Sequence, residues 1–302
     1  MQKNVWLAAA ALAVLAPSVA LIANAVAQPA PVATPAAGIT QTVDPPADYQ
    51  PPKKRVAPFT GFAEAMRATN PLAKKPTPKG PDGKPVLSGL WGGIPSAAGA
   101  GGLRRDGTFE PDQAALQRAS GWLKPMYKPQ FWNKVRGLDY GKSDGDPVFA
   151  CNPGGVPRMN VPAQIIQTPA QTVLVYNGMR TRVVPTDGRK LTDQDFDMST
   201  FDGVAVGHWD GDTLVVETVG FNDISWLQWQ GYFHSNQMKV TERFTRTGDL
   251  LFYNYTVDDP DVLLEPWTQG TLVMRLMPAN GRVVEGDPCV VLPAGGDPYL
   301  RG

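Results

Sequence analysis

The stretch from Gly203 to Asp223, GVAVGHWDGDTLVVETVGFND, decides the fold class. Two runs of alternating residues flank Asp210-Gly211, a residue pair that favours a two-residue β-hairpin turn. In that register Val204 lies opposite Glu217. One face of the hairpin then carries Val204, Val206, His208, Thr213, Val215, Glu217 and Val219, and the other carries Ala205, Gly207, Trp209, Leu214, Val216 and Thr218. The sequence therefore predicts an antiparallel hairpin with a glutamate in the middle of a valine face.

From Gln164 onward the pattern is almost wholly β. Short alternating runs separated by turn residues indicate roughly nine or ten strands in an antiparallel meander. A meander avoids exposed edges most simply by closing into a barrel or by folding into a sandwich. Two short helices are expected before it, one from Pro111 to about Leu123 and one after Pro129.

Residues 1–27 have the features of a secretory signal peptide. Lys3 supplies positive charge, and Trp6 to Ile22 is an apolar run interrupted by Pro17. Two small-x-small cleavage patterns follow within Ala23 to Ala27. Cleavage is the favoured interpretation and an uncleaved membrane anchor the alternative. After cleavage no membrane span is expected, and the mature protein would be periplasmic or secreted.

Residues 28–85 have the composition of a disordered tether. They contain 13 prolines among 58 residues and almost no periodic apolar pattern. Such a segment buries too little apolar surface to offset the entropy lost on ordering. Only Phe62 to Ala68 has the pattern of a short helix. Residues 86–302 are expected to form a single β-rich domain.

The chain has two cysteines, Cys151 and Cys289. Because exported proteins enter an oxidising space, a disulfide between them is expected, with two free buried thiols as the alternative. This bridge would close a loop of about 140 residues and stabilise the fold by roughly 4–5 kcal/mol in the chain-entropy model. No C-x-x-C or C-x-x-C-H motif is present, which argues against a C-x-x-C redox site and against covalent haem attachment.

Lysine plus arginine and aspartate plus glutamate number 28 each, so the formal charges balance. A balanced chain without a basic block argues against nucleic acid or an anionic membrane surface as the main partner. The sequence contains no P-loop, no G-x-G-x-x-G after a strand, no G-x-S-x-G elbow and no H-E-x-x-H. A small molecule is therefore the expected partner, no cofactor is expected, and the oligomeric state is left open.

A rigid loop is expected from Asp146 to Met159, DPVFACNPGGVPRM, where prolines flank two glycines. Arg158 stands near its end. This arginine either binds an anion at the mouth of a cavity or bonds carbonyl groups of its own loop, and the second interpretation is favoured.

A long irregular segment from Phe221 to Gln237 is rich in aromatic residues. It carries Trp226, Trp229, Tyr232 and His234. These rings would either close a hydrophobic cavity over a ligand or plug one end of the barrel.

His208 and His234 are the only histidines, so a site of three histidines is excluded. A site of two histidines and one carboxylate fits the counts, but no spacing in the chain indicates one, and no metal is expected. In the expected register His208 lies opposite Thr213, too far along the strand from Glu217 for a hydrogen bond. His208 is therefore expected at the rim of the barrel, beside the turn.

Several longer stretches resemble a family of exported bacterial proteins that are mostly described as hypothetical. The resemblance covers roughly Gly89 to Trp267. It rests on DPVFACNPGGVPR, GHWDGDTLVVETVGFND, HSNQMKVTERFTR and TVDDPDVLLEPW, with C-x-P-x-G-V-P-R and W-x-G-D-T-L-V-V-x-T-x-G-F-N as shared patterns. It implies export and a predominantly β fold, with no agreed activity. The family pattern has a histidine at the position of Val204, so a His–carboxylate pair across these strands would lack its histidine here.

The leading functional hypothesis is a β-barrel enzyme that acts on a small apolar or aromatic compound by proton transfer, as a lyase, isomerase or hydrolase. Glu217 or Glu242 would be the general base, with a pKa raised by its apolar face. His234 would be the acid partner, oriented by Asp223. Substrate contacts are expected from Arg158, His208, Trp226, Trp229, Tyr232 and Tyr255. The alternatives are a non-catalytic protein that binds a hydrophobic ligand and, more weakly, a structural envelope protein.

Overall fold

The protein is mainly antiparallel β with short helices. A computed structural model describes residues 60–93, 125–131, 134–135, 146–228, 231–286 and 288–291. The strands are β1 (Gly89–Gly93), β2 (Gln164–Gln167), β3 (Gln171–Val175), β4 (Thr181–Pro185), β5 (Val204–Asp210), β6 (Thr213–Val219), β7 (Lys239–Thr247), β8 (Leu250–Asp258), β9 (Trp267–Thr268) and β10 (Leu272–Leu276).

The helical elements among the described residues are all short. They are α1 (Thr60–Thr69), α4 (Asp193–Phe196) and the 3-10 turns η2 (Pro129–Phe131), η4 (Pro147–Ala150) and η5 (Asn177–Met179). The turn η2 stands where a second helix was expected. The expected signal peptide, the expected helix after Pro111 and the aromatic residue Trp229 lie outside the described residues.

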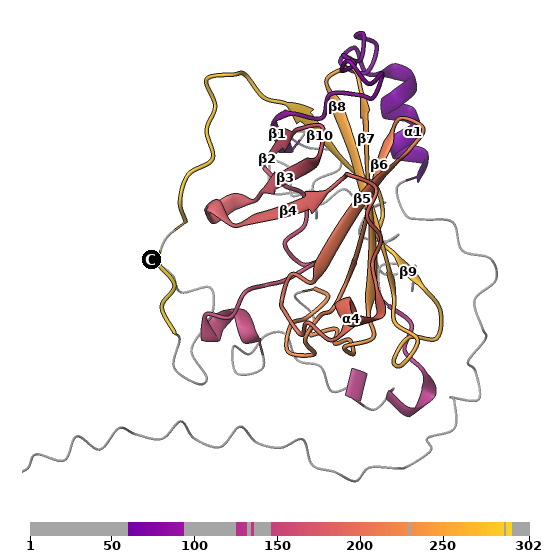
Figure 1. Ribbon diagram of the computed structural model, residues 1–302, viewed down its shortest axis with the longest axis vertical. Helices are drawn as coiled ribbons and strands as arrows, with labels where there is room; N and C mark the ends of the chain where they lie inside the picture. Colours follow the sequence, from indigo (N-terminus) through magenta and orange to yellow (C-terminus); the bar gives the residue numbers. More distant parts are fainter. Residues whose placement is uncertain are drawn as a thin grey trace, which may run out of the picture. The chain divides into compact units, whose positions relative to one another are not determined.

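The strands form a nearly closed barrel, which confirms the expected fold class. In the ten-stranded sheet the hydrogen-bonded order is β4-β3-β2-β1-β10-β8-β7-β6-β5, and β9 pairs with β8 off this path. All the ladders are antiparallel. Figure 1 shows how the path curves round so that its two ends, β4 and β5, lie next to each other.

The seam between β4 and β5 is closed by side chains. A Cβ atom on Gly207 of β5 would lie 3.0 Å from both Val184 Cγ1 and Thr186 Cγ2. The absence of a side chain at Gly207 therefore lets the β4 side approach the β5 backbone closely. Just before the two strands, Arg180 and Asp202 form an ion pair with a 2.6 Å separation.

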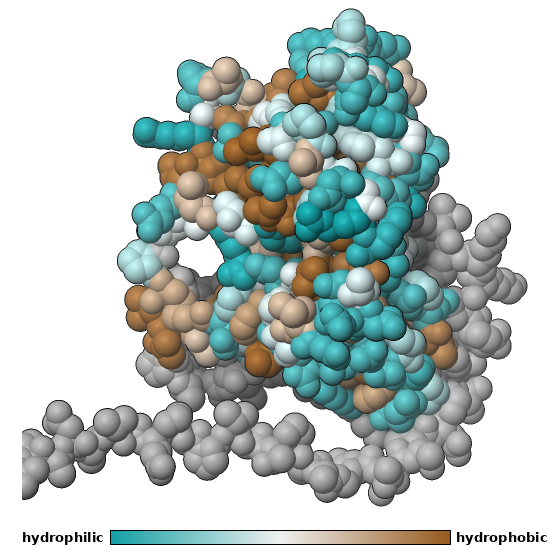
Figure 2. Space-filling model, in the orientation of Figure 1, coloured by the Kyte–Doolittle hydropathy of each residue, from teal (hydrophilic) through white to brown (hydrophobic). Residues whose placement is uncertain are grey.

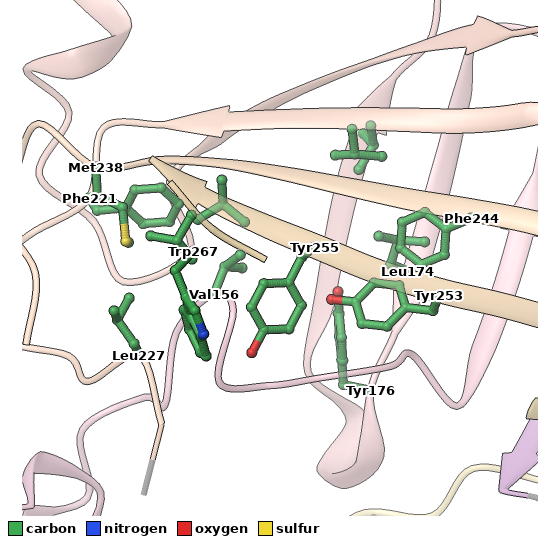
Figure 3. Packing of buried hydrophobic residues seen from close by; sticks show 14 of the residues in the cluster. Val156, Leu174, Tyr176, Phe221, Leu227, Met238, Phe244, Tyr253, Tyr255 and Trp267 are labelled. Atoms are coloured by element: carbon green, nitrogen blue, oxygen red, sulfur yellow. The ribbon is translucent and has the colours of Figure 1, made fainter. Parts of the chain in front are cut away.

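The core fills the inside of the barrel, and alternation along each strand decides which residues enter it. On β8, for example, Leu251, Tyr253, Tyr255 and Val257 are buried in one cluster. Figure 3 shows part of this cluster, in which Leu174, Tyr176, Phe244 and Tyr253 gather near one end of the view, Val156, Phe221, Leu227 and Trp267 near the other, and Tyr255 between them. The interior is therefore a packed core built largely from aromatic rings.

The central hairpin is β5–β6, but its register differs from the expected one by two residues. Asp210 pairs with Thr213, so the two-residue turn consists of Gly211 and Asp212. Gly211 has a φ of 57°, whereas Asp212 does not have a positive φ. Positive φ at the first central position alone is typical of a type II′ turn with glycine first, whereas the expected turn placed glycine second.

A shift of two residues keeps every side chain on its expected face and changes only the partners. Glu217 lies opposite Val206, and Val204 lies opposite Val219. The face that points into the barrel is the Trp209 face, because Leu214 of this face belongs to the core cluster. The valine face with Glu217 is consequently the outer face of the barrel.

Residues 60–85 are part of the folded unit, so the expectation of a tether reaching Pro85 is wrong for this portion. Ala63 of α1 and Ala73 pack with Leu250, Phe252 and Val273 in a second apolar cluster on the outer side of β8 and β10. The guanidinium of Arg67 lies 4.1 Å from the centre of the Phe252 ring. Composition predicted disorder because it carries no information about tertiary contacts. It could not show that this segment covers an apolar face of the sheet.

Cys151 and Cys289 form the expected disulfide. Their Cα atoms are 5.8 Å apart and they are separated by 138 residues in the sequence. The bridge joins the end of η4 to the segment that follows β10. Among the described residues, no helix is both long and apolar enough to cross a bilayer.

Candidate functional site

A polar network lies inside the barrel, formed by Tyr176, Arg182, Thr218, Glu242 and Tyr253 and called here the interior network. Arg182 on β4 donates through Nη1 to Glu242 Oε2 on β7 at 2.8 Å and to Tyr176 OH at 2.9 Å. Its Nη2 donates to Thr218 Oγ1 on β6 at 3.0 Å. Tyr253 OH donates to the second oxygen of Glu242, Oε1, at 3.1 Å.

The interior network is deeply buried and internally satisfied. The side chains of Arg182 and Glu242 are 4% and 1% exposed. Burial tends to lower the pKa of Arg182, but the charge of Glu242 and its hydrogen bonds outweigh this and raise the pKa. Burial, followed by the charge of Glu242, raises the pKa of Tyr253, which therefore stays neutral and donates. Both carboxylate oxygens of Glu242 are thus occupied, which leaves it poorly placed to act as a free general base.

Glu217 lies on the outer face and pairs with Lys239, whose Nζ is 2.5 Å from Glu217 Oε1. This hydrogen bond lowers the pKa of Glu217, with smaller help from the charges of Lys239, His208 and Lys190. The expected rise in pKa is therefore wrong, because a half-buried carboxylate beside a lysine is stabilised in its charged form. His208 is exposed on the same outer face, opposite Val215.

His234 is buried and hydrogen-bonded to Ser225, a residue that the sequence did not single out. His234 Nδ1 lies 2.9 Å from the carbonyl oxygen of Ser235, and Nε2 lies 2.9 Å from Ser225 Oγ. A carbonyl oxygen only accepts, so Nδ1 carries the proton. In the neutral ring Nε2 then accepts from the hydroxyl of Ser225. Asp223 is exposed and does not orient the ring, because both ring nitrogens are held by Ser225 and Ser235.

The buried carboxylate of Asp259 fixes Ser235, whose carbonyl oxygen is hydrogen-bonded to His234. Asp259 accepts from the backbone N–H of Ser235 at 2.6 Å and from its hydroxyl at 2.8 Å. Desolvation lowers the pKa of His234, while the backbone carbonyls of Ser235 and Ser225 and the charges of Asp259 and Asp223 act in the opposite direction. The ring is therefore held neutral, in one tautomer and one orientation.

A third group, called here the barrel-end group, consists of Gln228, Tyr255 and Trp267. The rings of Tyr255 and Trp267 meet edge to face with their centres 5.7 Å apart. Gln228 Nε2 donates to Tyr255 OH at 2.9 Å. Trp267 is 3% exposed, and within the described part of the chain its Nε1 is a buried donor without a hydrogen-bond partner. Figure 3 shows the indole nitrogen on the side of Trp267 that faces the Tyr255 ring.

Arg158 and Trp226, both expected to contact substrate, lie near each other. The guanidinium of Arg158 makes a two-pronged ion pair with Asp146, at 2.7 Å and 2.6 Å. Asp146 also accepts from Val148 N and so caps η4. The carbon of the guanidinium is 5.7 Å from the centre of the Trp226 ring. Arg158 is thus bound to a carboxylate of its own loop, rather than only to loop carbonyls as the favoured interpretation held.

Tyr232 is buried in the core cluster, and its ring centre is 6.4 Å from that of Tyr127. Of the expected site residues, the structure therefore brings His234 and Tyr232 to the core and places Tyr255 beside Trp267. Glu217 and His208 lie on the outside of the barrel.

Two of the site residues that were not predicted from the sequence nevertheless have a recognisable signal in it. Arg182 alternates with Val184 in the strand TRVVP, and an arginine two residues from a buried valine shares its face. Trp267 ends one of the resembling stretches, TVDDPDVLLEPW, although its unpartnered nitrogen has no sequence signature. Ser225 had no signal, because nothing local in the sequence connects it with His234, nine positions further along the chain.

Comparisons with models of protein families, with curated proteins and with solved structures find no match. The resemblance to a family of exported proteins therefore stays an expectation.

The interior network predicts a large difference between two Glu→Gln substitutions. Glu242→Gln removes the charge that compensates buried Arg182 and should lower the free energy of unfolding by about 3–5 kcal/mol. Glu217→Gln, the matched control in a partly exposed pair, should change it by about 1 kcal/mol or less. Urea denaturation of the two variants measures both values. Similar losses in the two variants would contradict the assignment of Glu242 to a buried pair.

The burial of His234 predicts a pH dependence of stability. Because the pKa of His234 is lowered in the folded protein, the unfolded chain takes up this proton first as pH falls below its value of about 6.5. The free energy of unfolding should thus decrease by up to about 1.4 kcal/mol per pH unit below that value, until the folded pKa is reached. Denaturant unfolding at pH 7.5 and 5.5 measures the change.

The matched controls for this dependence use both histidines. His234→Gln should remove most of the decrease between pH 7.5 and 5.5, whereas His208→Gln, at an exposed position, should retain it. A wild-type protein equally stable at both pH values would argue against a buried neutral His234.

Proposed function

We propose that the protein is an exported β-barrel that binds a small aromatic or apolar compound carrying a hydrogen-bond acceptor. The observation that carries this proposal is the buried, unpartnered Nε1–H of Trp267 in the barrel-end group. A buried donor without a partner costs about 1–3 kcal/mol, so a ligand oxygen that accepts from it would gain affinity.

The chemistry around Trp267 supports a ligand of this class. Tyr255 OH accepts from Gln228, and its own proton remains available to an acceptor. Val156, Leu227 and Phe221, all in the core cluster, supply apolar surface at the same end of the barrel. Figure 3 shows them grouped around Trp267 and Tyr255. Apolar walls with a few convergent donors are the usual composition of a small-molecule site.

Export is part of this proposal. Support comes from the disulfide between Cys151 and Cys289, since disulfides persist in oxidising compartments. The features of residues 1–27 point the same way. The periplasm or the extracellular space is the proposed location.

Binding is the function that this geometry supports best, since it is shared by the expected enzyme and the expected binding protein. A proton-transfer role for Glu217 or Glu242 has less support, because both carboxylates are already paired with a cation.

A matched ligand pair tests the proposal. The ketone 2-acetylnaphthalene should bind the wild-type protein more tightly than 2-ethylnaphthalene, which lacks the acceptor oxygen. Trp267→Phe should weaken binding of the ketone about 5–10-fold, the value of one hydrogen bond. It should leave the affinity for the hydrocarbon nearly unchanged. Isothermal titration calorimetry measures all four affinities.

The matched control is Trp91→Phe. Trp91 Nε1 already donates to the carbonyl oxygen of Leu87 at 2.9 Å, so this change should lower stability while keeping the preference for the ketone. If the wild-type protein binds neither compound, or if Trp267→Phe retains the preference, the proposal is wrong.

A further inference from the structure

We infer that Ser225 is a nucleophile activated by His234 and that it transfers acyl groups from small aromatic esters to water. The substrate class rests on the proposed function. The nucleophile itself rests on the geometry of Ser225 and His234 alone.

The hydrogen bonding gives His234 the form that a general base needs. Its Nδ1–H is committed to the Ser235 carbonyl, so the lone pair on Nε2 faces the hydroxyl of Ser225 at 2.9 Å. This distance is within reach for proton transfer, and a nucleophile beside a base that is itself oriented by a third group is the recurring pattern of activated serines.

The surrounding chain holds the pair in register. Asp259 fixes Ser235 through its N–H and hydroxyl, and this holds in place the carbonyl that orients His234. Phe221 meets the His234 ring edge to face with the centres 6.3 Å apart. The backbone of Gly155 lies close to Ser225, since a Cβ atom on Gly155 would lie 3.2 Å from Ser225 Oγ. Asp259 is a positioning residue here and does not touch the reacting atoms.

Ser225 is buried, but it is next in the chain to a residue at the protein surface. It is 2% exposed, while its neighbour Ile224 is 50% exposed and Trp226 is half-buried. Val156, next to Gly155 in the chain, and Leu227 lie in Figure 3 at the same end of the core as Trp267 of the barrel-end group. The nucleophile and the barrel-end group therefore belong to the same part of the fold.

The reaction balances with water as the only co-reactant. Ser225 Oγ forms a bond to the ester carbonyl carbon as its proton passes to His234 Nε2. The alcohol leaves as the ester C–O bond breaks, and it takes the proton from Nε2. Water then attacks the acyl-serine by the same route, with His234 accepting its proton and returning it to Oγ as the acid is released. Asp259 and Asp223, whose charges favour the protonated ring, stabilise the imidazolium formed on the way.

Covalent labelling tests the inference. Phenylmethanesulfonyl fluoride at pH 8 should add one phenylmethanesulfonyl group to the folded protein, with loss of fluoride, and tandem mass spectrometry should locate it on Ser225. Ser225→Ala should abolish the label. His234→Gln should slow labelling by about 100-fold or more, the usual contribution of a general base. Ser88→Ala, at a serine in the segment before β1 whose hydroxyl accepts from Gln167 N, should be labelled like the wild type.

The failures of the two proposals are distinguishable. Naphthalene compounds that bind without any label on Ser225 would leave the binding proposal standing and show that the Ser225–His234 bond is only structural. A labelled Ser225 without binding of these compounds would retain the nucleophile and overturn the substrate class. A label that persists in Ser225→Ala would overturn the assignment of the nucleophile.

Discussion

The ion pair between Arg182 and Glu242 is the interaction on which the barrel depends. Arg182 lies on β4, at one end of the hydrogen-bonded path of strands, and Glu242 lies on β7, close to the other end. The described residues include no hydrogen-bonded ladder between β4 and β5. By reaching across to Thr218 and Glu242, Arg182 therefore joins the two ends of the sheet from the inside and adds to the packing on Gly207 and to the Arg180–Asp202 ion pair at the seam.

This arrangement also limits where chemistry can occur. A buried pair is stable only when its remaining hydrogen-bonding positions are satisfied, and Tyr176, Tyr253 and Thr218 provide this. The middle of the barrel is filled by the interior network and by aromatic rings. Among the described residues, the buried donor without a partner is Trp267 Nε1, which lies in the barrel-end group. Figure 2 shows, in addition, apolar residues on the surface, among them a brown area over the part of the sheet where Figure 1 places β2, β3 and β4. Ile166 and Val183 are exposed on these strands.

The sequence predicted the fold class well, because alternation and turn residues are local signals. It predicted the two faces of the β5–β6 hairpin correctly, but not its register or which face is inside. The register depended on whether Gly211 comes first or second in the turn. Both Asp210-Gly211 and Gly211-Asp212 are suitable turn dipeptides, so the sequence permits either register. The inside could not be identified, since both faces carry valines and the deciding contacts come from β4 and β7. The site was less predictable still: His234 and Tyr255 were named, but Ser225, Arg182 and Trp267 gain their roles only from partners distant in the sequence.

A double-mutant cycle on Arg182 and Glu242 measures whether the two side chains stabilise each other across the barrel. The free energy of unfolding in urea at pH 7 is measured for the wild type, Arg182→Met, Glu242→Met and the double variant. The account predicts that each single change costs about 3–5 kcal/mol, because it leaves one buried charge without its partner, and that the double variant loses far less than their sum. Losses that simply add would show that the two side chains do not stabilise each other across the barrel, and would contradict the account.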